Sequence, residues 1–368
     1  MSKNVISILQ LIREQQNISR AEIAGLTGLS RPAVSAIVEK ALASGMISET
    51  GIGESNGGKP PVMLSIVSEF CGALGLDLGE ENLIRGMVCD AGGAIVAEGA
   101  EQYDNQFDSI LAAAALLVEK LKKQSGKLAL RGIGVAVSGI VDDNTNEVVE
   151  SSNFDIIGKK MSDKLQTSCQ MPVFLSNRAR TAAHAEKVGG NASDCADFIY
   201  LSIGKSIGCG IYRDGGLFRG SFNGAGEIST LLVPDENGNK RLEEVITESY
   251  LCNAFERLAR RKYDWDELCR AWHDGHPDAC KVFEKNSEHV AYAAAVAANL
   301  LNPQRIILGG RFKELGDPYL EIFRRHFTSG LTAPFRDRID VRLSRFGRKA
   351  TAYGAALKVI DKVFRFEL

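Results

Sequence analysis

The side chains best suited to contacting another molecule lie near the N-terminus, on one face of a predicted helix. That face carries small or hydrogen-bonding side chains at helical spacing, namely Arg31, Ser35, Ala36, Glu39 and Lys40. Such side chains let a helix enter the major groove of DNA and reach base edges. The predicted DNA-binding residues are Ser30, Arg31, Ser35, Ala36, Lys40 and Lys59.

Three predicted helices and a hairpin would position these side chains. Apolar residues recur at helical spacing over residues 4–16. A Ser19–Glu22 capping box predicts a second helix from Arg20 to Thr27, and Gly28 ends it. Ser30 caps a third helix, which ends at Gly45. Two short strands at 46–49 and 61–66 enclose a glycine-rich tip that carries Lys59, as in a winged helix-turn-helix.

Charge favours a locally confined DNA contact. The whole chain has a net charge of −2 and a pI of about 6.3, which argues against general attraction to nucleic acid or membrane. Within the first 66 residues, six basic and five acidic side chains leave a net charge of only +1. Weak binding by each copy favours a dimer that reads two half-sites. The alternative is a three-helix packing module that binds no nucleic acid.

The remaining 300 residues carry a duplicated pattern. An apolar strand, a glycine turn and two further strands occur over 72–98, and the same order returns over 198–218. Such a repeat indicates a duplicated α/β body with a cleft between two lobes. Glycine turns can bring backbone amides to phosphates, although plain hairpins use them as well. An alanine-rich stretch, 284–302, predicts a long buried or interface helix, and 351–363 predicts a closing helix.

Composition predicts a cytoplasmic globular protein. The 368 residues are 45% hydrophobic, enough for two or three domains with sizeable cores. We expect neither a signal peptide nor a membrane span, because no long apolar stretch is present. The eight cysteines are scattered without a C-x-x-C pair, which indicates reduced thiols rather than disulfides or a thiolate zinc site.

The chain resembles the ROK family of repressors, open reading frames and sugar kinases, in the branch of xylose and N-acetylglucosamine repressors. The resemblance covers nearly the whole length and rests on ordered motifs: the 57–61 linker, Asp77-x-Gly79, Ser138-Gly139, Ser152-Asn153, the Asn177 loop, 204–210, 226–228, Gly309-Gly310 and 353–357. It implies a winged helix-turn-helix (α+β) followed by a two-lobe α/β body of the actin/hexokinase-like (ribonuclease H-like) fold. The expected domains are 1–66, 72–190 with a C-terminal helix at 351–365, and a dimerising lobe at 191–350.

The departures from the family pattern argue against catalysis. The family's kinases use an aspartate as general base where this chain has Arg178, and a guanidinium cannot accept that proton. The nucleotide loops, by resemblance, are degenerate: Lys205 and Ser206 follow Gly204, and Glu80 and Glu81 follow Gly79. Their remaining residues are Asp77, Gly79, Gly204, Gly208, Gly210, Gly309 and Gly310. The family's zinc-binding histidine and cysteines are missing, so we expect no metal and no cofactor.

The resemblance leaves a sugar pocket. Its residues would be Ser138, Gly139, Asn153, Asn177, Arg178, Glu227 and Glu243, since amides and carboxylates can form paired hydrogen bonds with vicinal hydroxyls. Arg178 suggests an anionic effector such as a phosphosugar or sugar acid. Two alternatives stay open: these polar residues stabilise loops in a ligand-free pocket, or Arg178 pairs with a neighbouring carboxylate.

Together these features predict a sugar-responsive transcriptional repressor with a catalytically inactive kinase-like domain. Its partners would be a double-stranded operator with an inverted repeat and a small carbohydrate or phosphosugar, and it would form a homodimer or a dimer of dimers, without a membrane. One alternative is an active sugar kinase with an appended DNA reader. Another is a DNA-bound scaffold that has no small ligand.

Overall fold

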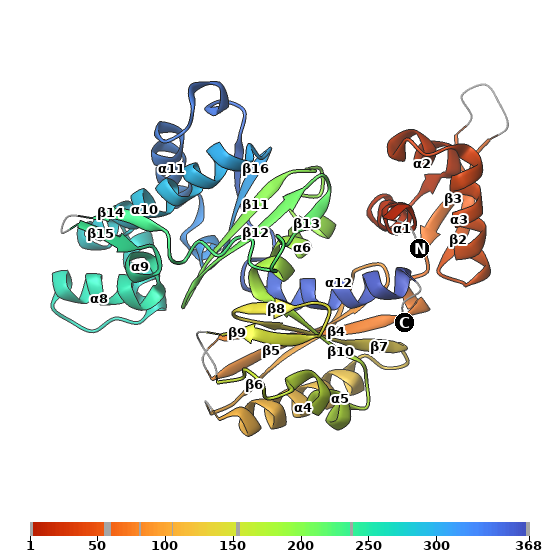
Figure 1. Cartoon of the computed structure of the whole chain (residues 1–368), viewed down its shortest axis with the longest axis horizontal. Coiled ribbons are helices and arrows are strands. Elements are labelled where there is room, and N and C mark those ends of the chain that lie inside the picture. The colour runs from red at the N-terminus through yellow and green to blue at the C-terminus, as the bar shows by residue number, and fades with distance from the viewer. Residues whose placement is uncertain are drawn as a thin grey trace. The chain divides into compact units, whose positions relative to one another are not determined.

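The chain folds into two compact units in the computed structural model (Figure 1). The first unit joins Met1–Ser176 to Ala352–Leu368, and the second unit is Asn177–Thr351. The structure describes residues 3–54, 60–80, 82–104, 106–151, 155–235 and 238–365.

The first unit begins with a winged helix-turn-helix, called the reader below. It contains α1 (Lys3–Gln15), α2 (Arg20–Thr27), α3 (Arg31–Ala43) and a sheet of order β1-β3-β2, formed by β1 (Ile18–Ser19), β3 (Val62–Ile66) and β2 (Ile47–Ile52). The Ser19–Glu22 capping box starts α2, Gly28 ends it at φ 69°, and the Ser30 side chain caps α3. These sequence predictions are confirmed, and β2 extends three residues beyond the predicted strand.

A five-stranded sheet forms the centre of the first lobe. Its order is β10-β7-β4-β5-β6, from β10 (Val173–Asn177), β7 (Leu130–Val137), β4 (Gly72–Glu80), β5 (Leu83–Asp90) and β6 (Ile95–Gln102). Helices α4 (Phe107–Gln124) and α5 (Met161–Cys169) cover one face, and α12 (Ala350–Phe364) lies on the other (Figure 1). The short elements are η1 (Ser68–Phe70), β8 (Ile140–Asp142) and β9 (Glu147–Glu150).

The second unit repeats this sheet. Its order is β13-β12-β11-β16-β17, from β13 (Gly216–Phe218), β12 (Ile207–Arg213), β11 (Phe198–Ile203), β16 (Arg305–Gly310) and β17 (Asp340–Leu343). In both sheets an antiparallel three-strand meander is followed by a strand parallel to its first member: β7 beside β4 and β16 beside β11. The duplication read from the sequence is therefore confirmed.

Helices surround the second sheet on both faces. They are α6 (Arg178–Gly189), α7 (Glu243–Ile246), α8 (Glu248–Ala259), α9 (Trp265–His273), α10 (Pro277–Leu301) and α11 (Phe312–Ser329), with the hairpin β14 (Leu232–Asp235) and β15 (Gly238–Arg241), and η2 (Ala333–Phe335) and η3 (Gly347–Lys349). Helix α6 packs on β11 and β12, so the second unit begins at Asn177, whereas the sequence suggested residue 191.

Helix α10 is longer than the sequence indicated. It begins at Pro277 rather than 284, because His276 caps it and proline suits the first helical turn. Most of its inward positions are buried, whereas Tyr292 and Leu300 are 44% and 79% exposed. Its role in dimerisation stays a prediction. Over the part of the chain that the structure describes, no helix is both long and apolar enough to cross a membrane.

Strand alternation places apolar side chains on one face of each sheet and glycines on the other. In the first sheet, Leu74 and Leu76 belong to the core under α4 and α5, while a Cβ at Gly75 between them would collide with the α12 backbone. In the second sheet, Cys209 belongs to the core on the α10 side, while Gly208 and Gly210 face α6. Each sheet therefore carries one helix at unusually close range.

Candidate functional site

The exposed face of α3 has the form that the sequence predicted for a DNA-reading helix. Its opposite face buries Val34, Val38 and Ala41 completely in the reader's core. The outward positions Arg31, Ala36 and Lys40 are exposed and Ser35 is half-buried, whereas Lys59 lies outside the described residues. Small Ala36 between two basic side chains leaves room for a close approach to base edges.

Two details adjust the charge and geometry of this face. The Ser30 hydroxyl accepts a hydrogen bond from the Ala33 N–H at 3.4 Å, so Ser30 contributes first as a helix cap. Arg20 on α2 pairs with Glu39 at 2.9 Å and with Glu49 at 3.4 Å. This pairing offsets the one carboxylate on the exposed face of α3, and the other charged side chains of that face, Arg31 and Lys40, are both basic.

The first lobe presents a bulge near the end of strand β4 and a loop after the neighbouring strand β7. The Asp77 carboxylate is buried and accepts a hydrogen bond from the Gly79 N–H at 3.0 Å, which fixes the bulge within β4. Ser138 is also buried, and Gly139 has φ 113° with the Glu150 carbonyl where a Cβ would lie. Only glycine fits at position 139.

Helix α6 presents two of the predicted effector residues at its N-terminus. The Asn177 side chain caps the helix by accepting from the Arg180 N–H at 3.1 Å. Arg178 follows at the first helical position and is half-buried. Burial and the Glu186 carboxylate raise the pKa of Tyr200, and the positive charge of Arg178 opposes that rise. The α6 N-terminus thus combines a helix dipole with a guanidinium and has no acidic residue in its first turn.

The loop that carries Glu227 is tied to α6 and to β12. Arg180 is 2% exposed, and its guanidinium donates a hydrogen bond to the Asn223 carbonyl. Gly226 has φ 91° and lies against the Cys209 carbonyl, where any larger residue would clash. Glu227 itself is exposed, and its charge adds to the effect of burial in raising the pKa of Cys209 to about 12.

Glu243 reaches the same neighbourhood through the β14–β15 hairpin. The Glu243 N–H donates to the Ser229 carbonyl at 3.1 Å, two residues after Glu227, and the Leu242 N–H donates to Leu231 at 2.8 Å. Glu243 is half-buried and lies 3.9 Å from Arg241. Among the described residues there is no group of three or more His, Cys, Asp and Glu side chains that could hold a metal ion.

The glycines assigned to nucleotide loops in the second lobe have packing roles. A Cβ at Gly208 or Gly210 would meet Ala179 of α6 within 2.7 Å, so both positions admit the helix. A Cβ at Gly309 would collide with the Tyr200 side chain. The Gly310 N–H donates to the Tyr200 hydroxyl at 3.2 Å, which leaves less backbone available for a phosphate.

An ion-pair network encloses the end of β16 next to these glycines. The Arg311 N–H donates to Ile203 at 2.9 Å, and its guanidinium pairs with Glu248 at 2.9 Å, Glu314 at 3.4 Å and Asp266 at 3.5 Å. Arg348 also pairs with Glu314 and lies 3.7 Å from Asp266. Burial raises the pKa of Glu248, while Arg311 and Arg348 oppose the rise. These charges are satisfied within the lobe.

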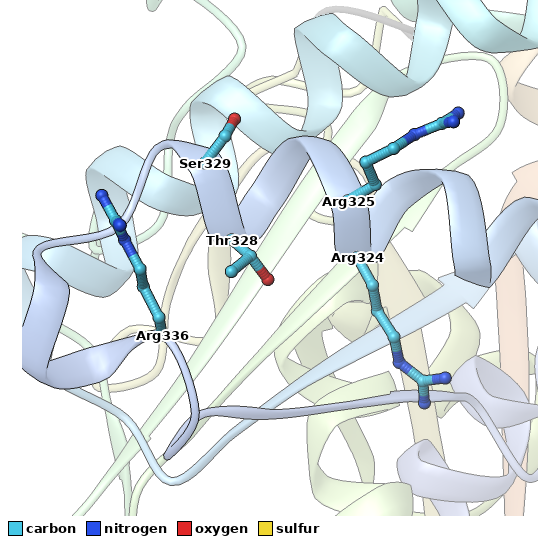
Figure 2. A pocket seen from close by; sticks show the side chains of 5 residues that line it. All are labelled: Arg324, Arg325, Thr328, Ser329 and Arg336. Atoms are coloured by element: carbon cyan, nitrogen blue, oxygen red, sulfur yellow. The ribbon is translucent and has the colours of Figure 1, made fainter.

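A shallow depression of about 550 Å³ lies at the C-terminal end of α11, away from the predicted effector residues (Figure 2). Figure 2 shows Arg324 and Arg325 pointing to opposite sides of the helix, with Arg336 on the following loop. Arg324 donates to the Val341 carbonyl at 2.6 Å, Arg336 donates to Leu331 at 3.2 Å, and Arg325 pairs with Glu284 at 2.8 Å. The side chains do not converge on one point, so this surface is a solvated basic face.

The second unit therefore brings Asn177, Arg178, Glu227 and Glu243 into one lobe, while Ser138 and Gly139 belong to the first unit, and Asn153 lies outside the described residues. Sequence reasoning did not identify the contacts that Arg180 and Arg311 make. Arg180 stands two positions after Arg178, and Arg311 directly follows the Gly309-Gly310 pair. Neither position in the sequence indicates which groups the arginine side chain contacts.

A helix-turn-helix reader followed by two lobes of equal strand order defines a protein that couples DNA contact to an actin/hexokinase-like body. Residues 73–362 match the ROK family, and residues 1–48 match the winged helix-turn-helix DNA-binding family. The chain belongs to the ROK family.

Named relatives span nearly the whole chain. The xylose repressor of Caldicellulosiruptor bescii is 26% identical, covering 99% of this chain and 96% of the relative. The xylose repressor of Bacillus subtilis is 27% identical over 96% of this chain and 94% of its own length. The transcriptional dual regulator NagC of Escherichia coli is 23% identical over 96% and 91%.

Solved structures support the fold. A ROK family transcriptional regulator, a homologue of the Escherichia coli Mlc protein, matches with a TM-score of 0.81 at 21% identity, covering 98% of this chain and 97% of that chain. A ROK glucokinase from Streptomyces griseus in complex with glucose and AMPPNP matches with a TM-score of 0.71 at 22% identity, over 78% of this chain and 98% of that chain.

Proposed function

We propose that the protein is a sugar-responsive repressor whose reader binds operator DNA and whose kinase-like body binds an effector without phosphorylating it. The proposal is supported by two features that occur together in one chain. The exposed face of α3 bears Arg31 and Lys40, and the body has Arg178 where the family's kinases have their general base. The relatives named xylose repressor and N-acetylglucosamine repressor support the regulatory role.

Operator binding would place α3 in the major groove. Arg31 and Lys40 lie about two and a half turns apart, at the two edges of the exposed face, with Ala36 between them, so the base-contacting surface is short. A reader of such low net charge binds weakly alone, and two readers on an inverted repeat would supply the missing affinity. A homodimer or a dimer of dimers follows from this requirement.

The effector is an anionic sugar derivative in this proposal. The N-terminus of α6 favours negative charge, and Arg178 adds a guanidinium that can hold a phosphate or carboxylate in two parallel hydrogen bonds. Asn177, Glu227 and Glu243 supply the amide and carboxylate oxygens that sugar hydroxyls require. Arg180 positions the Glu227 loop against α6 through the Asn223 carbonyl.

Phosphoryl transfer is not part of this function. Arg178 stays protonated at neutral pH and cannot remove a proton from a sugar hydroxyl. Loss of a general base typically lowers the rate by roughly 10²–10⁴-fold. The Gly310 amide and the Arg311 guanidinium already have partners within the lobe, which disfavours a triphosphate there.

A thermal-shift screen tests the ligand class. The full chain is heated with neutral sugars, sugar phosphates, sugar acids or ATP, and a ligand at a hundredfold excess over its Kd stabilises by about 2.7 kcal/mol. We expect one sugar phosphate or sugar acid to raise the melting temperature of the wild type and of Arg213→Gln, but not of Arg178→Gln. Arg213 is a matched control because its side chain is 64% exposed at the end of β12.

Other outcomes separate the alternatives. Stabilisation by ATP, with phosphate transfer to a sugar, would favour the sugar kinase. No stabilisation by any compound would favour a scaffold without a small ligand. Equal stabilisation by a neutral sugar and by its phosphate would contradict the claim that the effector is anionic. It would leave the rest of the proposed function standing.

A further inference from the structure

The two ends of the chain meet in a buried ion pair. Arg13 of α1 lies 3.2 Å from Asp361 of α12, and the two side chains are only 2% and 6% exposed. Gln10 donates a second hydrogen bond to the other Asp361 oxygen at 2.9 Å. The Arg13 guanidinium also stacks over the Phe364 ring, with 5.5 Å to its centroid. Four side chains therefore join the reader to the last helix.

This contact is directional in a way that an apolar contact is not. The two oxygens of Asp361 accept from different residues of α1, so the carboxylate fixes both the position and the rotation of that helix. A buried pair of opposite charges contributes less to net stability than its Coulomb energy implies, because both charges lose their hydration. In some proteins such a pair selects one arrangement over others, because any shift leaves a charge buried without its partner.

The other side of α12 packs closely on the backbone of the first sheet. A Cβ at Gly75 of β4 would collide with the Ala352 carbonyl, and a Cβ at Gly134 of β7 would collide with the Ala355 carbonyl. The Tyr353 hydroxyl donates to the Gly93 carbonyl at 2.8 Å. Because the helix backbone rests on the strand backbones, α12 follows any displacement of β4 and β7.

Strand β4 carries the Asp77–Gly79 bulge near its end, and the Ser138–Gly139 turn follows β7. A continuous set of contacts within the first unit thus runs from this bulge and this turn, through β4 and β7, to α12 and then to α1. The reader's exposed pairs, such as Arg20 with Glu39, provide no such link, because both partners belong to the reader itself.

We propose that Asp361 and Arg13 are positioning residues that fix the reader's orientation on the body, and that DNA affinity depends on this orientation. The inference rests on the DNA-binding part of the proposed function and is independent of the effector's identity. The buried pair sets how the two readers of an assembly are presented to two half-sites, while the reader's own fold does not require it.

Binding of DNA by the full chain tests this inference. A duplex is first selected from a random pool with the wild type, and its Kd is measured for Asp361→Asn, for the apolar pair Arg13→Met with Asp361→Leu, and for Lys120→Met. Lys120 is a control because it forms a surface ion pair with Glu101 in the same unit and is 52% exposed. Resistance to urea is measured for each variant in parallel.

The apolar pair separates position from stability, because apolar replacement of a buried ion pair is often neutral or stabilising. We expect its urea midpoint to match the wild type while its Kd rises at least tenfold, equivalent to about 1.4 kcal/mol. Asp361→Asn should weaken DNA binding by at least as much, and Lys120→Met should bind as the wild type does.

Two results would overturn the inference. If the apolar pair binds the duplex as tightly as the wild type, the ion pair serves stability alone. If Asp361→Asn binds normally, orientation of the reader does not depend on the pair. A wild-type chain that enriches no duplex contradicts DNA binding itself, and the inference then falls with the proposed function.

Discussion

The two sheets of the body have the same strand order, and they use their glycine-bearing faces for different helices. In the first sheet, Gly75 and Gly134 admit α12, which contacts the reader through Asp361. In the second sheet, Gly208 and Gly210 admit α6, whose N-terminus carries Asn177 and Arg178.

The same kind of packing, a helix placed directly against strand glycines, occurs in both sheets and supports two different helices. A glycine in a strand costs conformational entropy, so its retention in the middle of a strand requires a close neighbour. In both sheets that neighbour is a helix backbone or a methyl group, and in both cases the helix carries residues with a proposed role. In this chain the glycines in the middle of the strands therefore mark where α12 and α6 pack.

Filling the glycine positions should produce the largest effect. Gly134→Ala forces a methyl group into the Ala355 backbone, and Gly210→Ala forces one towards Ala179 and Ala183, where overpacking costs about 1–3 kcal/mol or more. We expect Gly134→Ala to cost more, because its added Cβ would come closer to the Ala355 carbonyl than a Cβ at position 210 would come to the Ala179 carbonyl. Urea unfolding measures both variants.

Gly204→Ala is the matched control for this experiment. No atom lies within 4 Å of the added Cβ, so its free energy of unfolding should stay within about 1 kcal/mol of the wild type. A Gly210→Ala variant as stable as Gly204→Ala would break the comparison, because α6 would then tolerate a side chain beneath it.

Removal of the Arg311 guanidinium should have an intermediate effect. Arg311→Ala leaves Glu248 and Glu314 without one of their cations, and hydrogen bonds to charged groups contribute about 1.5–3 kcal/mol each. We expect a loss near 2 kcal/mol in urea unfolding. Arg261→Ala, which removes an exposed pair with Glu267, should cost less than about 1 kcal/mol. Equal losses in the two variants would show that the network is no stronger than a surface pair.

The smallest expected effect is a change in how stability depends on pH, and it arises where His289 of α10 meets the β14–β15 hairpin. His289 is buried 3.8 Å from Asp235 at the end of β14. Burial lowers the pKa of His289, with Lys285 adding to this effect and Asp235 and Glu288 opposing it. The unfolded chain therefore binds a proton first as the pH falls below about 6.5, so this histidine makes the folded state less stable towards acid.

His289→Asn should flatten that dependence. The difference in melting temperature between wild type and variant is measured from pH 7.5 to 5, and it should shift in favour of the variant as the pH falls. A constant difference across this range would show that His289 does not change its protonation on unfolding. Lys281→Met, an exposed substitution on the same helix, should leave the wild-type slope unchanged.

Local signals in the sequence predicted the reader and the duplicated sheets well. The Ser19–Glu22 box, Gly28 and Ser30 act through neighbours within four residues. The local sequence therefore suffices to predict the helix ends that they form. The repeated strand order was also readable, because turns separate the short apolar strands in the same order in both copies.

Partners distant in sequence could not be predicted in the same way. Asp361 and Arg13 are 348 residues apart, and Arg311 pairs with carboxylates of two other helices, Glu248 of α8 and Asp266 of α9. The expected first lobe, 72–190, includes the residues of α6, and only the packing of this helix on Gly208 and Gly210 places it with the second sheet. Family resemblance suggested Arg178 as an effector contact, but the tie from Arg180 to the Glu227 loop required the fold.

The central claim is that DNA binding responds to a sugar derivative without phosphate transfer. Its most direct test measures the Kd of the full chain for a pool-selected duplex, by fluorescence anisotropy, with and without xylose, N-acetylglucosamine, their phosphates and ATP. We expect one sugar compound to change the Kd at least tenfold, ATP to leave it unchanged, and Arg31→Ala to weaken binding whether or not the sugar is present. A Kd that no sugar compound alters, or one that ATP alone alters, would contradict the account.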